Sequence, residues 1–448
     1  WELSMNKVRF APSTTGYLHI GNFRTALINF LFAKNKNGHF MLRIDDTDHV
    51  RSLQKYEDAI KQDLSWVGIN WDSLEKQSSR LSFYDQARQK LLDKKRAYPC
   101  FETAEELSLK RKKQLSSGKP PIYDRAALNL SDSDIADLKA KGKSPHYRFL
   151  LDHTDVNWND LVKGASQYNM SNLSDPVIIR EDGRVIYTLA SVVDDIDFGV
   201  TDILRGEDHM TNSAAQIQLF EALESSPPNL GHLSLLTDIS GAGLSKRMGS
   251  ISLRNLKDEG FQPMAISSLL SKVGTSVPVE ISSHINQIIS DNDTRKFGKS
   301  KPKFDINELR GLNSKLFKML DFSDISNQLD KFNFKISSDF WELVKGNIEN
   351  LQELELWWNI IYGNIEPIYN DENFINTAIE TLPEGNFDKN TWTTWTSVLM
   401  KETGRKGKEL YNPMRMCLTG QNKGPEMATL VFLMGKEKVL ERLTNNSL

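Results

Sequence analysis

The chain has 448 residues, of which 39% are hydrophobic and 26% are charged, a composition typical of a globular protein of about three domains. Its 26 glycines and 15 prolines are too few for a collagen-like or low-complexity chain. The net charge of −3 excludes a protein that covers nucleic acid with a wholly basic surface, but it leaves room for a local basic patch.

The sequence also bears on where the protein works. No apolar stretch approaches the roughly 18 residues of a membrane-spanning helix, and the N-terminus shows no basic region followed by an apolar run. We therefore expect neither a membrane span nor a secretory signal. The two cysteines, Cys100 and Cys417, form neither a zinc motif nor a disulfide framework. This cysteine usage suits a reducing compartment, and we expect a cytoplasmic protein.

The first part of the chain alternates strands and helices. Hydrophobic periodicity predicts a strand over 8–11, a turn-rich segment over 12–16, a helix over 19–36 with one apolar face, and a second strand over 40–44. Further helices are predicted over 53–67, with Gly68 after its end, and over 79–96. This order begins a parallel α/β sheet.

The pattern changes near Tyr98 and later returns. A basic helix is predicted over 105–115 and a strand over 147–151. The segments 177–180 and 184–188 flank a predicted hairpin turn. A strand over 202–204 and a helix over 211–223, capped by Thr211 or Asn212, restore the α/β pattern. From residue 251 onward the chain is predicted to be helical, with turns at Pro278, Pro302, Pro367, Pro383 and Pro413.

The first cluster with chemical character is Arg9-Phe-Ala-Pro-Ser-Thr-Thr-Gly-Tyr-Leu-His-Ile-Gly-Asn22, where a strand end, a turn and a helix N-terminus meet. The free N–H groups and positive dipole of a helix N-terminus bind phosphate well. Gly21 costs the helix about 1 kcal/mol relative to alanine, and we expect it to let a base or phosphate approach the backbone. His19 and Asn22 share one helix face.

Two further clusters carry charge. Residues 243–250, Gly-Leu-Ser-Lys-Arg-Met-Gly-Ser, form a glycine-flanked loop whose Lys246 suits a leaving pyrophosphate. Residues 43–48, Arg-Ile-Asp-Asp-Thr-Asp, end the second predicted strand, where ligands of open α/β sheets bind. Their carboxylates fit an ammonium group or a metal ion, and equally a cap for the following helix.

The fourth cluster runs from Tyr187 to Asp195 and continues at 204–209 as Leu-Arg-Gly-Glu-Asp-His. Arg205 follows a predicted strand, so its guanidinium is a candidate fork for a carboxylate ligand. Each cluster taken singly fits an ordinary surface loop or ion pair. Only their joint order along the chain points to a function.

That joint order resembles the class I aminoacyl-tRNA synthetases, and among them the bacterial glutamyl-tRNA synthetases. The resemblance covers residues 8–255 and continues at 401–408 and 412–415, which are similar to the family's anticodon-binding region. It implies a Rossmann-type α/β catalytic domain split by an α+β insertion and followed by an all-helical C-terminal half. The implied parts are catalytic halves at 1–98 and 186–250, an acceptor-end-binding insertion at 99–185, a stem-contact domain at 251–322 and an anticodon-binding domain at 323–448.

The resemblance implies a ligase that uses ATP and magnesium to make glutamyl-adenylate and then transfers L-glutamate to the 3′-terminal adenosine of tRNA(Glu), and in some relatives of tRNA(Gln). The ATP-binding residues that it implies are His19, Gly21, Asn22, Glu207, Ser245, Lys246 and Arg247. His19, Asn22 and Lys246 would act by positioning and charge stabilisation, because the glutamate carboxylate is itself the nucleophile. Two positions depart from the family: Asn22 replaces a histidine, and Gly243 replaces a frequent lysine.

For glutamate, the resemblance implies a binding set of Arg9, Ala11, Ser13, Asp45, Tyr187, Ser191 and Arg205. The chemistry agrees, because a side-chain carboxylate suits an arginine fork and an α-ammonium group suits Asp45. Many relatives have asparagine at the place of Ser191, which implies a water-mediated or otherwise different contact there.

Some relatives hold zinc in the insertion. Here only Cys100 stands in that region, with Glu102 two residues on, and tetrahedral zinc needs a fuller set of nitrogen and sulfur ligands, so we predict no structural zinc. Residues 295–318 hold eight basic and two acidic side chains and would face the tRNA stem. Residues 401–442 hold nine basic and five acidic side chains and would lie near the anticodon. Trp392 and Trp395 fit base stacking or a buried helical core equally.

Alternatives to this function stay open. A shortened paralogue transfers glutamate to a modified tRNA base, but it lacks the C-terminal helical half. A nucleotidylyltransferase would lack the 43–48 motif, and a glutaminyl-tRNA synthetase would have a β-barrel C-terminal half. The Asn22 and Gly243 departures leave a non-catalytic tRNA-binding paralogue as the last alternative. The family suggests a monomer without membrane association.

Overall fold

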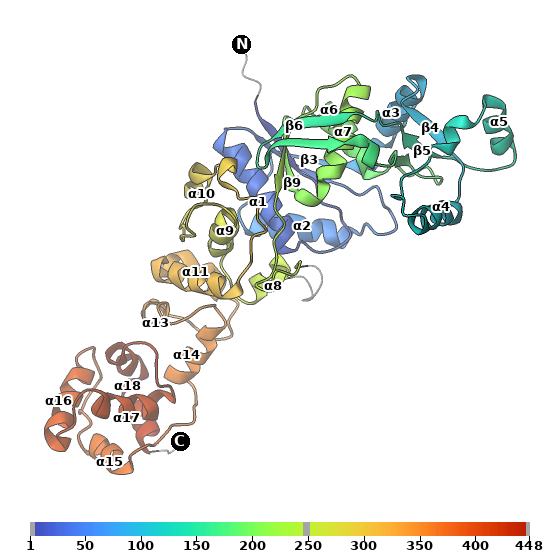
Figure 1. Cartoon of the computed structure of the whole chain (residues 1–448). Helices are drawn as coiled ribbons and strands as arrows, with labels where there is room; N and C mark the ends of the chain where they lie inside the picture. Colours follow the sequence, from blue (N-terminus) through green and yellow to red (C-terminus); the bar gives the residue numbers. More distant parts are fainter. Residues whose placement is uncertain (1–4, 245–250, 445–448) are drawn as a thin grey trace. The chain divides into compact units, whose positions relative to one another are not determined.

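The structure is a computed structural model that describes residues 5–244 and 251–444 (Figure 1). The chain divides into two compact units. The first unit consists of Trp1–Asn255 and Ser267–Asp305, and the second of Leu256–Ile266 and Ile306–Leu448.

The first unit is built on a five-stranded parallel sheet with the strand order β10-β9-β1-β2-β3. The strands are β1 (Lys7–Phe10), β2 (His39–Ile44), β3 (Ser73–Lys76), β9 (Asp202–Gly206) and β10 (Asn229–Leu233). The chain runs outward from β1 to β3 on one side and from β9 to β10 on the other, so the strand order reverses between β1 and β9. In open parallel sheets this reversal point is where ligands bind, beyond the carboxyl ends of the strands.

The helices of the first unit follow the predicted alternation. They are α1 (Ile20–Asn35), α2 (Gln54–Trp66), α3 (Leu81–Asp93), α6 (Tyr187–Asp197), α7 (Met210–Ala222) and α10 (Ile285–Asp291), with the 3-10 turns η1 (Gln77–Arg80), η4 (Glu207–His209) and η5 (Thr294–Lys296). Helices α8 (Leu253–Asp258) and α9 (Pro263–Lys272) span the junctions between the units. Gly68 follows the end of α2 with φ +79°, as its predicted place after that helix requires.

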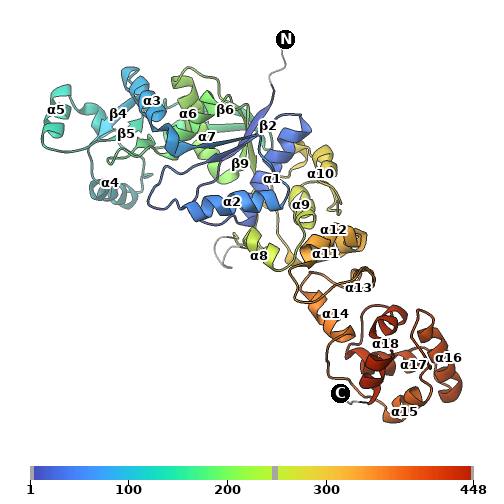
Figure 2. The ribbon, with the colours of Figure 1, turned by 180° about the vertical axis from the view of Figure 1, so that it is seen from behind.

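Helix α1 is buried on more sides than its apolar stripe predicts. Besides that stripe, Ile28 and Phe32 are also buried, and so are the polar side chains of Arg24 and Asn29. The helix packs on β1, β2 and β9, and α10 packs on it as well (Figure 2). The sequence around α1 gives no sign of this second cover, because α10 lies about 250 positions further along the chain.

The insertion contains the predicted basic helix and short strands. Its elements are β4 (Ala97–Cys100), α4 (Ala104–Ser116), η2 (Ala126–Asn129), α5 (Asp132–Ala140), β5 (His146–Phe149), β6 (Asp155–Asp160), β7 (Gly164–Asn169), η3 (Met170–Asn172) and β8 (Val177–Ile179). Strands β4, β5 and β8 form an antiparallel sheet, and β6 and β7 form a hairpin that packs against β10.

The predicted hairpin at 177–188 is correct in its turn and wrong in its second strand. The Gly183 N–H donates to the Arg180 carbonyl at 2.9 Å, and Ile179 pairs with Val185 in an isolated bridge. The chain then enters α6 at Tyr187, whose helix buries a long apolar face beside α7. The predicted side-chain cap of α7 is also wrong, because η4 leads directly into that helix.

The second unit is helical, as predicted. Its helices are α11 (Ile306–Met319), α12 (Phe322–Leu329), α13 (Ser338–Val344), α14 (Glu353–Ile361), α15 (Glu372–Glu380), α16 (Thr391–Thr403), α17 (Lys408–Thr419) and α18 (Met427–Thr444). They enclose a core that includes Trp341, Trp395 and Leu430. Trp395 is fully buried and Trp392 is 8% exposed, so both belong to this core, which was one of the two roles expected for them.

One predicted turn of the helical half is wrong. Pro413 lies inside α17, although proline removes a backbone hydrogen bond from a helix interior. The neighbouring Leu410, Met414 and Leu418 are fully buried, and their packing outweighs that loss. Over the described ranges, no helix has the length and apolar character needed to cross a membrane.

Candidate active site

A cleft of about 770 Å³ opens at the carboxyl ends of β1, β2, β9 and β10, within the first unit. This is the reversal point of the sheet, and the volume suits small-molecule ligands. The structure brings most of the predicted site residues together here, from five separate segments of the chain. Those that line the cleft are Arg9, Ala11, Ser13, His19, Gly21, Asn22, Asp45, Tyr187 and Arg205.

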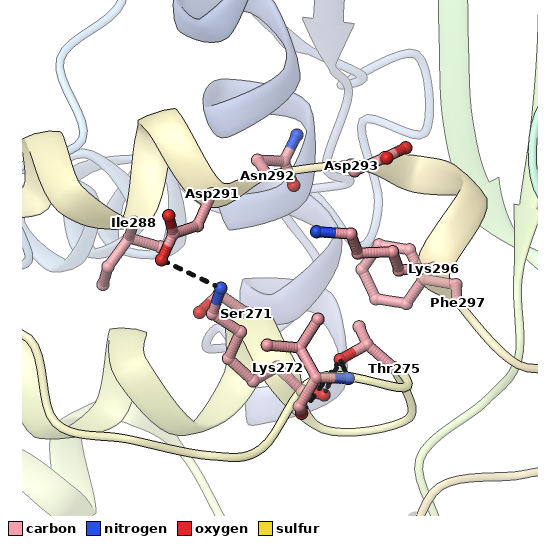
Figure 3. Close-up of a pocket in the computed structure, with 10 residues that line it drawn as sticks. Ser271, Lys272, Thr275, Ile288, Asp291, Asn292, Asp293, Lys296 and Phe297 are labelled. Carbon is pink, nitrogen blue, oxygen red and sulfur yellow. Dashed lines mark hydrogen bonds and ion pairs between the residues drawn. The ribbon is translucent and has the colours of Figure 1, made fainter.

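A second hollow of the first unit lies between α9 and α10 and is drawn in Figure 3. Lys272 and Asp291 face each other across it, with Nζ and Oδ2 3.3 Å apart. Its volume of about 10 Å³ is room for a single water molecule. The cleft at the strand ends, in contrast, has room for a small-molecule ligand.

His19 is the N-cap of α1. Its Nδ1 accepts the backbone N–H groups of Gly21 at 3.1 Å and of Asn22 at 3.3 Å. Burial lowers the pKa of His19, so the neutral ring is favoured, and an Nδ1 that accepts hydrogen bonds leaves the ring proton on Nε2. The imidazole therefore presents a neutral N–H donor at the N-terminus of α1.

The expectation that free backbone N–H groups of α1 bind phosphate is wrong. The N–H groups of Gly21 and Asn22 are taken by His19, and that of Ile20 donates to the Ile251 carbonyl at 3.1 Å. Anion binding at this end thus falls to side chains and to the helix dipole. Gly21 has a packing reason as well, because a Cβ there would lie 3.0 Å from Cε1 of the His19 ring.

Arg205 is a buried cation of the cleft whose described hydrogen-bond partners are all uncharged. Its Nη1 donates to the Tyr187 hydroxyl at 2.7 Å, and its Nη2 donates to Ser213 Oγ at 2.5 Å and to Gln216 Oε1 at 2.8 Å. The residue is 5% exposed, and within the described residues its Nε has no hydrogen-bond partner and its guanidinium pairs with no carboxylate. A fixed guanidinium that is bound by no carboxylate and lines a cleft is suited to an anionic ligand.

Arg9 differs from Arg205 because its charge is compensated. Its Nε and Nη2 donate to the two oxygens of Asp195 at 3.0 and 2.9 Å, and the same carboxylate accepts Arg43 Nη1 at 2.8 Å. Burial alone would raise the pKa of Asp195, but the charges of Arg9 and Arg43 outweigh it and lower that pKa. Arg9 thus lines the cleft as one half of a buried ion pair.

Asp45 lies directly after β2 and faces the cleft. Arg43 Nε and Nη2 donate to its two oxygens at 2.7 and 3.1 Å. Burial nevertheless raises the pKa of Asp45. The neighbouring Asp46 is occupied elsewhere, because it accepts the N–H and hydroxyl of Ser78. Asp45 and Asp48 both line the cleft, and Asp48 is the more exposed of the two and is paired with Arg51 and Arg184, so Asp45 is the better candidate for an ammonium group.

Two predicted residues lie outside the lining of the cleft. Ser191 is fully buried in α6, where its Oγ accepts Arg43 Nη2 at 2.7 Å. Glu207 turns to Lys163, with Oε2 and Nζ 2.7 Å apart. Their side chains thus lie behind the residues that line the cleft, and their expected roles in ligand binding stay predictions.

The second ATP-signature cluster is described only in part. Ser245, Lys246 and Arg247 lie outside the described residues, whereas Gly243 and Leu244 line the cleft. Lys301 lines the cleft beside them, although the sequence placed it in a stretch expected to face a tRNA stem. The backbone explains this position, because Thr237 donates to the Pro302 carbonyl and pairs with Gly243.

Sequence reasoning missed the residues that hold these groups in place. Arg43 is fully buried and binds Asp45, Asp195 and Ser191 at once. An arginine inside a buried strand was a signal that could have identified it, because such a charge needs partners. Ser213 in α7 gave no comparable signal.

The insertion places Glu102 and Tyr123 around Cys100. The Tyr123 hydroxyl donates to Glu102 Oε1 at 2.8 Å, and Lys110 Nζ lies 3.3 Å from the same oxygen. Cys100 is fully buried, and burial raises the pKa of its thiol to about 12. No group of three or more His, Cys, Asp or Glu side chains within the described ranges is arranged to hold a metal ion.

Comparisons with known families match both parts of the chain. Residues 5–311 match the family model described as "tRNA synthetases class I (E and Q), catalytic domain". Residues 326–446 match the model of an "Anticodon binding domain".

Individual relatives match nearly the whole chain. This chain is 46% identical over 444 residues to "Glutamate--tRNA ligase 1" of Maricaulis maris, and the alignment covers 99% of this chain and 100% of the relative. It is 44% identical over 441 residues to "Glutamate--tRNA ligase 1" of Rickettsia felis, with 98% of each covered. The crystal structure of glutamate-tRNA synthetase from Elizabethkingia anophelis superposes with a TM-score of 0.87 at 25% identity, covering 99% of both chains.

Proposed function

The chain belongs to the class I tRNA synthetases of the E and Q group, and we propose that it is a glutamate–tRNA ligase, which activates L-glutamate with ATP and transfers it to the 3′-terminal adenosine of tRNA(Glu). One observation supports glutamate in particular: the buried guanidinium of Arg205 faces the cleft, and no described carboxylate forms a direct ion pair with it. A glutamate side chain supplies that carboxylate. A glutamine amide would turn N–H groups toward N–H donors, which a polar site rejects strongly.

Glutamate binds with its two ends on opposite charges. Arg205 and the Tyr187 hydroxyl take the side-chain carboxylate, and Asp45 takes the α-ammonium group. Ala11 and Ser13 flank the ligand in the turn after β1, and Arg9 contributes the N–H groups that Asp195 leaves unused. This arrangement leaves the α-carboxylate directed toward the nucleotide.

ATP binds where α1 begins, with His19, Gly21 and Asn22 near its phosphates. An oxygen of the glutamate α-carboxylate attacks the α-phosphorus, the bond to the β-phosphate oxygen breaks, and pyrophosphate leaves. A carboxylate needs no general base, so the protein acts by positioning and by stabilising charge. His19 Nε2–H and the Asn22 amide donate to phosphate oxygens, and Ser245, Lys246 and Arg247 hold the leaving pyrophosphate.

The second step transfers the activated acyl group. A ribose hydroxyl of the terminal adenosine attacks the carbonyl carbon of glutamyl-adenylate, and AMP leaves with release of a proton. Glu207 and Ser191 support the adenosine and glutamate sites through Lys163 and Arg43. Mg²⁺ enters with ATP as the ordinary counter-ion of its phosphates.

We propose the same partners and setting that the sequence suggested. The insertion at 99–185 binds the acceptor end, residues 251–322 contact the stem, and residues 323–448 bind the anticodon. The chain acts as a cytoplasmic monomer on tRNA(Glu), with tRNA(Gln) as a second substrate to be tested. Nothing in the site favours transfer to a modified base.

The test is charging with labelled glutamate, ATP and magnesium, using purified tRNA(Glu) and tRNA(Gln) side by side. Charging of tRNA(Glu) is the expected result, and charging of both would define a non-discriminating enzyme. Absence of charging, together with tight tRNA binding, would contradict the proposal and favour the non-catalytic paralogue.

A further inference from the structure

Three buried polar side chains lie behind Arg205, and the mechanism above gives them no role. Ser213 comes from α7, His232 from β10, and Asp160 from the end of β6 in the insertion. Ser213 and His232 are fully buried, and Asp160 is 3% exposed. Burying three polar groups is costly unless each is hydrogen-bonded, so their arrangement calls for an explanation.

They form an unbroken chain of hydrogen bonds that ends on Arg205. Asp160 Oδ2 lies 2.5 Å from His232 Nδ1, and His232 Nε2 lies 2.6 Å from Ser213 Oγ. Ser213 Oγ in turn accepts Arg205 Nη2 at 2.5 Å. The sheet places two of these residues side by side, because Arg205 of β9 and His232 of β10 are direct partners in the parallel register.

The donor and acceptor roles are fixed at the two ends of this relay of hydrogen bonds. A guanidinium only donates, so Ser213 Oγ accepts from Arg205 and has one proton of its own to give. A carboxylate only accepts, so His232 carries a proton on Nδ1 toward Asp160. The Ser213 hydroxyl lies within hydrogen-bond distance of His232 Nε2 and of the His209 carbonyl, at 2.6 and 3.1 Å, with a lone pair aimed at Arg205.

The far end of the relay is held rigidly. Asp160 Oδ1 accepts the backbone N–H groups of Val162, Lys163 and His232 at 2.9–3.0 Å, and its Oδ2 also accepts Trp158 Nε1 at 3.1 Å. Burial alone would raise the pKa of Asp160, but the hydrogen bonds from His232 and from the Lys163 backbone outweigh it and hold that pKa well below its ordinary range. The carboxylate is therefore a fixed, ionised anchor.

We propose that Asp160, His232 and Ser213 are positioning residues, which hold the Arg205 guanidinium in the orientation that meets the side-chain carboxylate of glutamate. This inference rests on the proposed function. Arg205 has three protein partners: Tyr187 accepts from Nη1, and Ser213 and Gln216 both accept from Nη2. Of the two partners of Nη2, Ser213 is the one placed by this relay, because its Oγ meets His232 and His232 meets Asp160. Sub-ångström placement of a binding group is worth large factors in rate.

The relay makes a specific kinetic prediction. Ser213→Ala should raise the KM for glutamate about 10-fold, since one charged hydrogen bond is lost, while the KM for ATP and kcat stay within about twofold. His232→Asn should act in the same direction, because its amide still reaches Asp160 but no longer touches Ser213. A purely structural defect would instead lower the melting temperature and change all kinetic constants together.

Two comparisons make the test decisive. Ser267→Ala is the matched control, because Ser267 is equally buried and its Oγ has no hydrogen-bond partner among the described residues. It should leave glutamate kinetics unchanged. In an Arg205→Lys background, Ser213→Ala should have no further effect, because the relay acts only through the guanidinium.

The outcomes separate the relay from the function. If the wild type charges tRNA and the folded Ser213→Ala and His232→Asn variants keep the wild-type KM for glutamate, the relay is wrong and the function stands. The relay is also wrong if Ser213→Ala raises the KM for glutamate further in the Arg205→Lys background. If the wild type does not charge tRNA, the function fails, and glutamate binding by calorimetry on the same proteins decides the relay; unaltered or absent binding overturns it.

Discussion

His19 Nδ1 accepts the backbone N–H of Gly21 at 3.1 Å, while the same imidazole lines the cleft. One side chain thus ends a helix and faces the nucleotide site. The two roles use different ring atoms, because Nδ1 serves the backbone and Nε2 carries the proton. Substitutions at His19 can therefore separate stability from chemistry.

His19→Asn should keep the cap and lose the chemistry. Asparagine is among the best N-cap residues, so the melting temperature should stay at the wild-type value. The adenylation rate should fall about 100-fold, because the Nε2–H donor to phosphate is gone. His19→Ala should lose the same rate and in addition about 1 kcal/mol of the free energy of unfolding. Thermal melts measure the stability of each variant, and tRNA charging measures its activity. Full activity in His19→Asn would show that the ring serves the helix alone.

The acid limb of the reaction should follow His19. Burial lowers the pKa of this ring below 6.5, so the neutral, capping form persists at pH 6.5 and above. As the pH falls through the lowered pKa, Nδ1 gains a proton and turns it toward two N–H groups, so both the cap and the rate are lost. We expect kcat/KM for ATP to be constant above 6.5 and to decline below it. If the same decline occurs in His19→Asn, another group is responsible.

Gly21→Ala should cost activity and leave the fold intact. A Cβ at this position would stand 3.0 Å from Cε1 and 3.1 Å from Nδ1 of His19, so the ring must shift by a few tenths of an ångström. Alanine favours helix over glycine by about 1 kcal/mol in a helix interior, which offsets the strain. We expect an unchanged or higher melting temperature and a charging rate about 10-fold lower. A fully active Gly21→Ala would show that the position of the ring is not critical.

The sequence was sufficient to predict most of the catalytic fold. Apolar runs and glycine turns located β1, α1, β2 and α2, because burial decides these elements locally. It failed where neighbours distant in sequence decide. Tyr187 was placed in a strand because Gly183 marks a hairpin, yet the residues after Ile186 bury against α7 and therefore form a helix. Strands β3 and β10 were missed because each acquires its identity only from its neighbours in the sheet.

The site was predictable to the extent that motif residues face the ligand. Arg205, Asp45 and His19 line the cleft, since each lies at the carboxyl end of a strand or at the start of a helix. Ser191 and Glu207 stand in the same motifs but turn into the protein, and no local pattern reveals that direction. The partners of Arg205 were out of reach because Ser213 is joined to it only through the packing of α7 on the sheet.

Arg205→Lys should act on glutamate and little else. Lysine keeps one charge but cannot bind Tyr187, Ser213 and Gln216 at once, so the fork that meets the carboxylate is lost. The KM for glutamate should rise about 100-fold, the effect of losing charged hydrogen bonds of roughly 3 kcal/mol. The KM for ATP should be unchanged. Tyr187→Phe, which removes one partner only, is the graded control, and normal glutamate kinetics in Arg205→Lys would refute the assignment.

Gly243→Lys should strengthen ATP binding. A Cβ at Gly243 meets no atom within 4 Å, and its φ lies outside the left-handed region, so a side chain is tolerated. Because this residue lines the cleft next to the second signature, the added ammonium group can reach the polyphosphate. We expect the KM for ATP to fall about 2- to 5-fold at low salt, since one exposed charge contact is worth up to about 1 kcal/mol, and the gain to shrink as salt screens it. Gly243→Gln is the uncharged control, and an equal gain there would show that the length of the side chain and not its charge is responsible. An unchanged KM for ATP in Gly243→Lys would contradict the prediction.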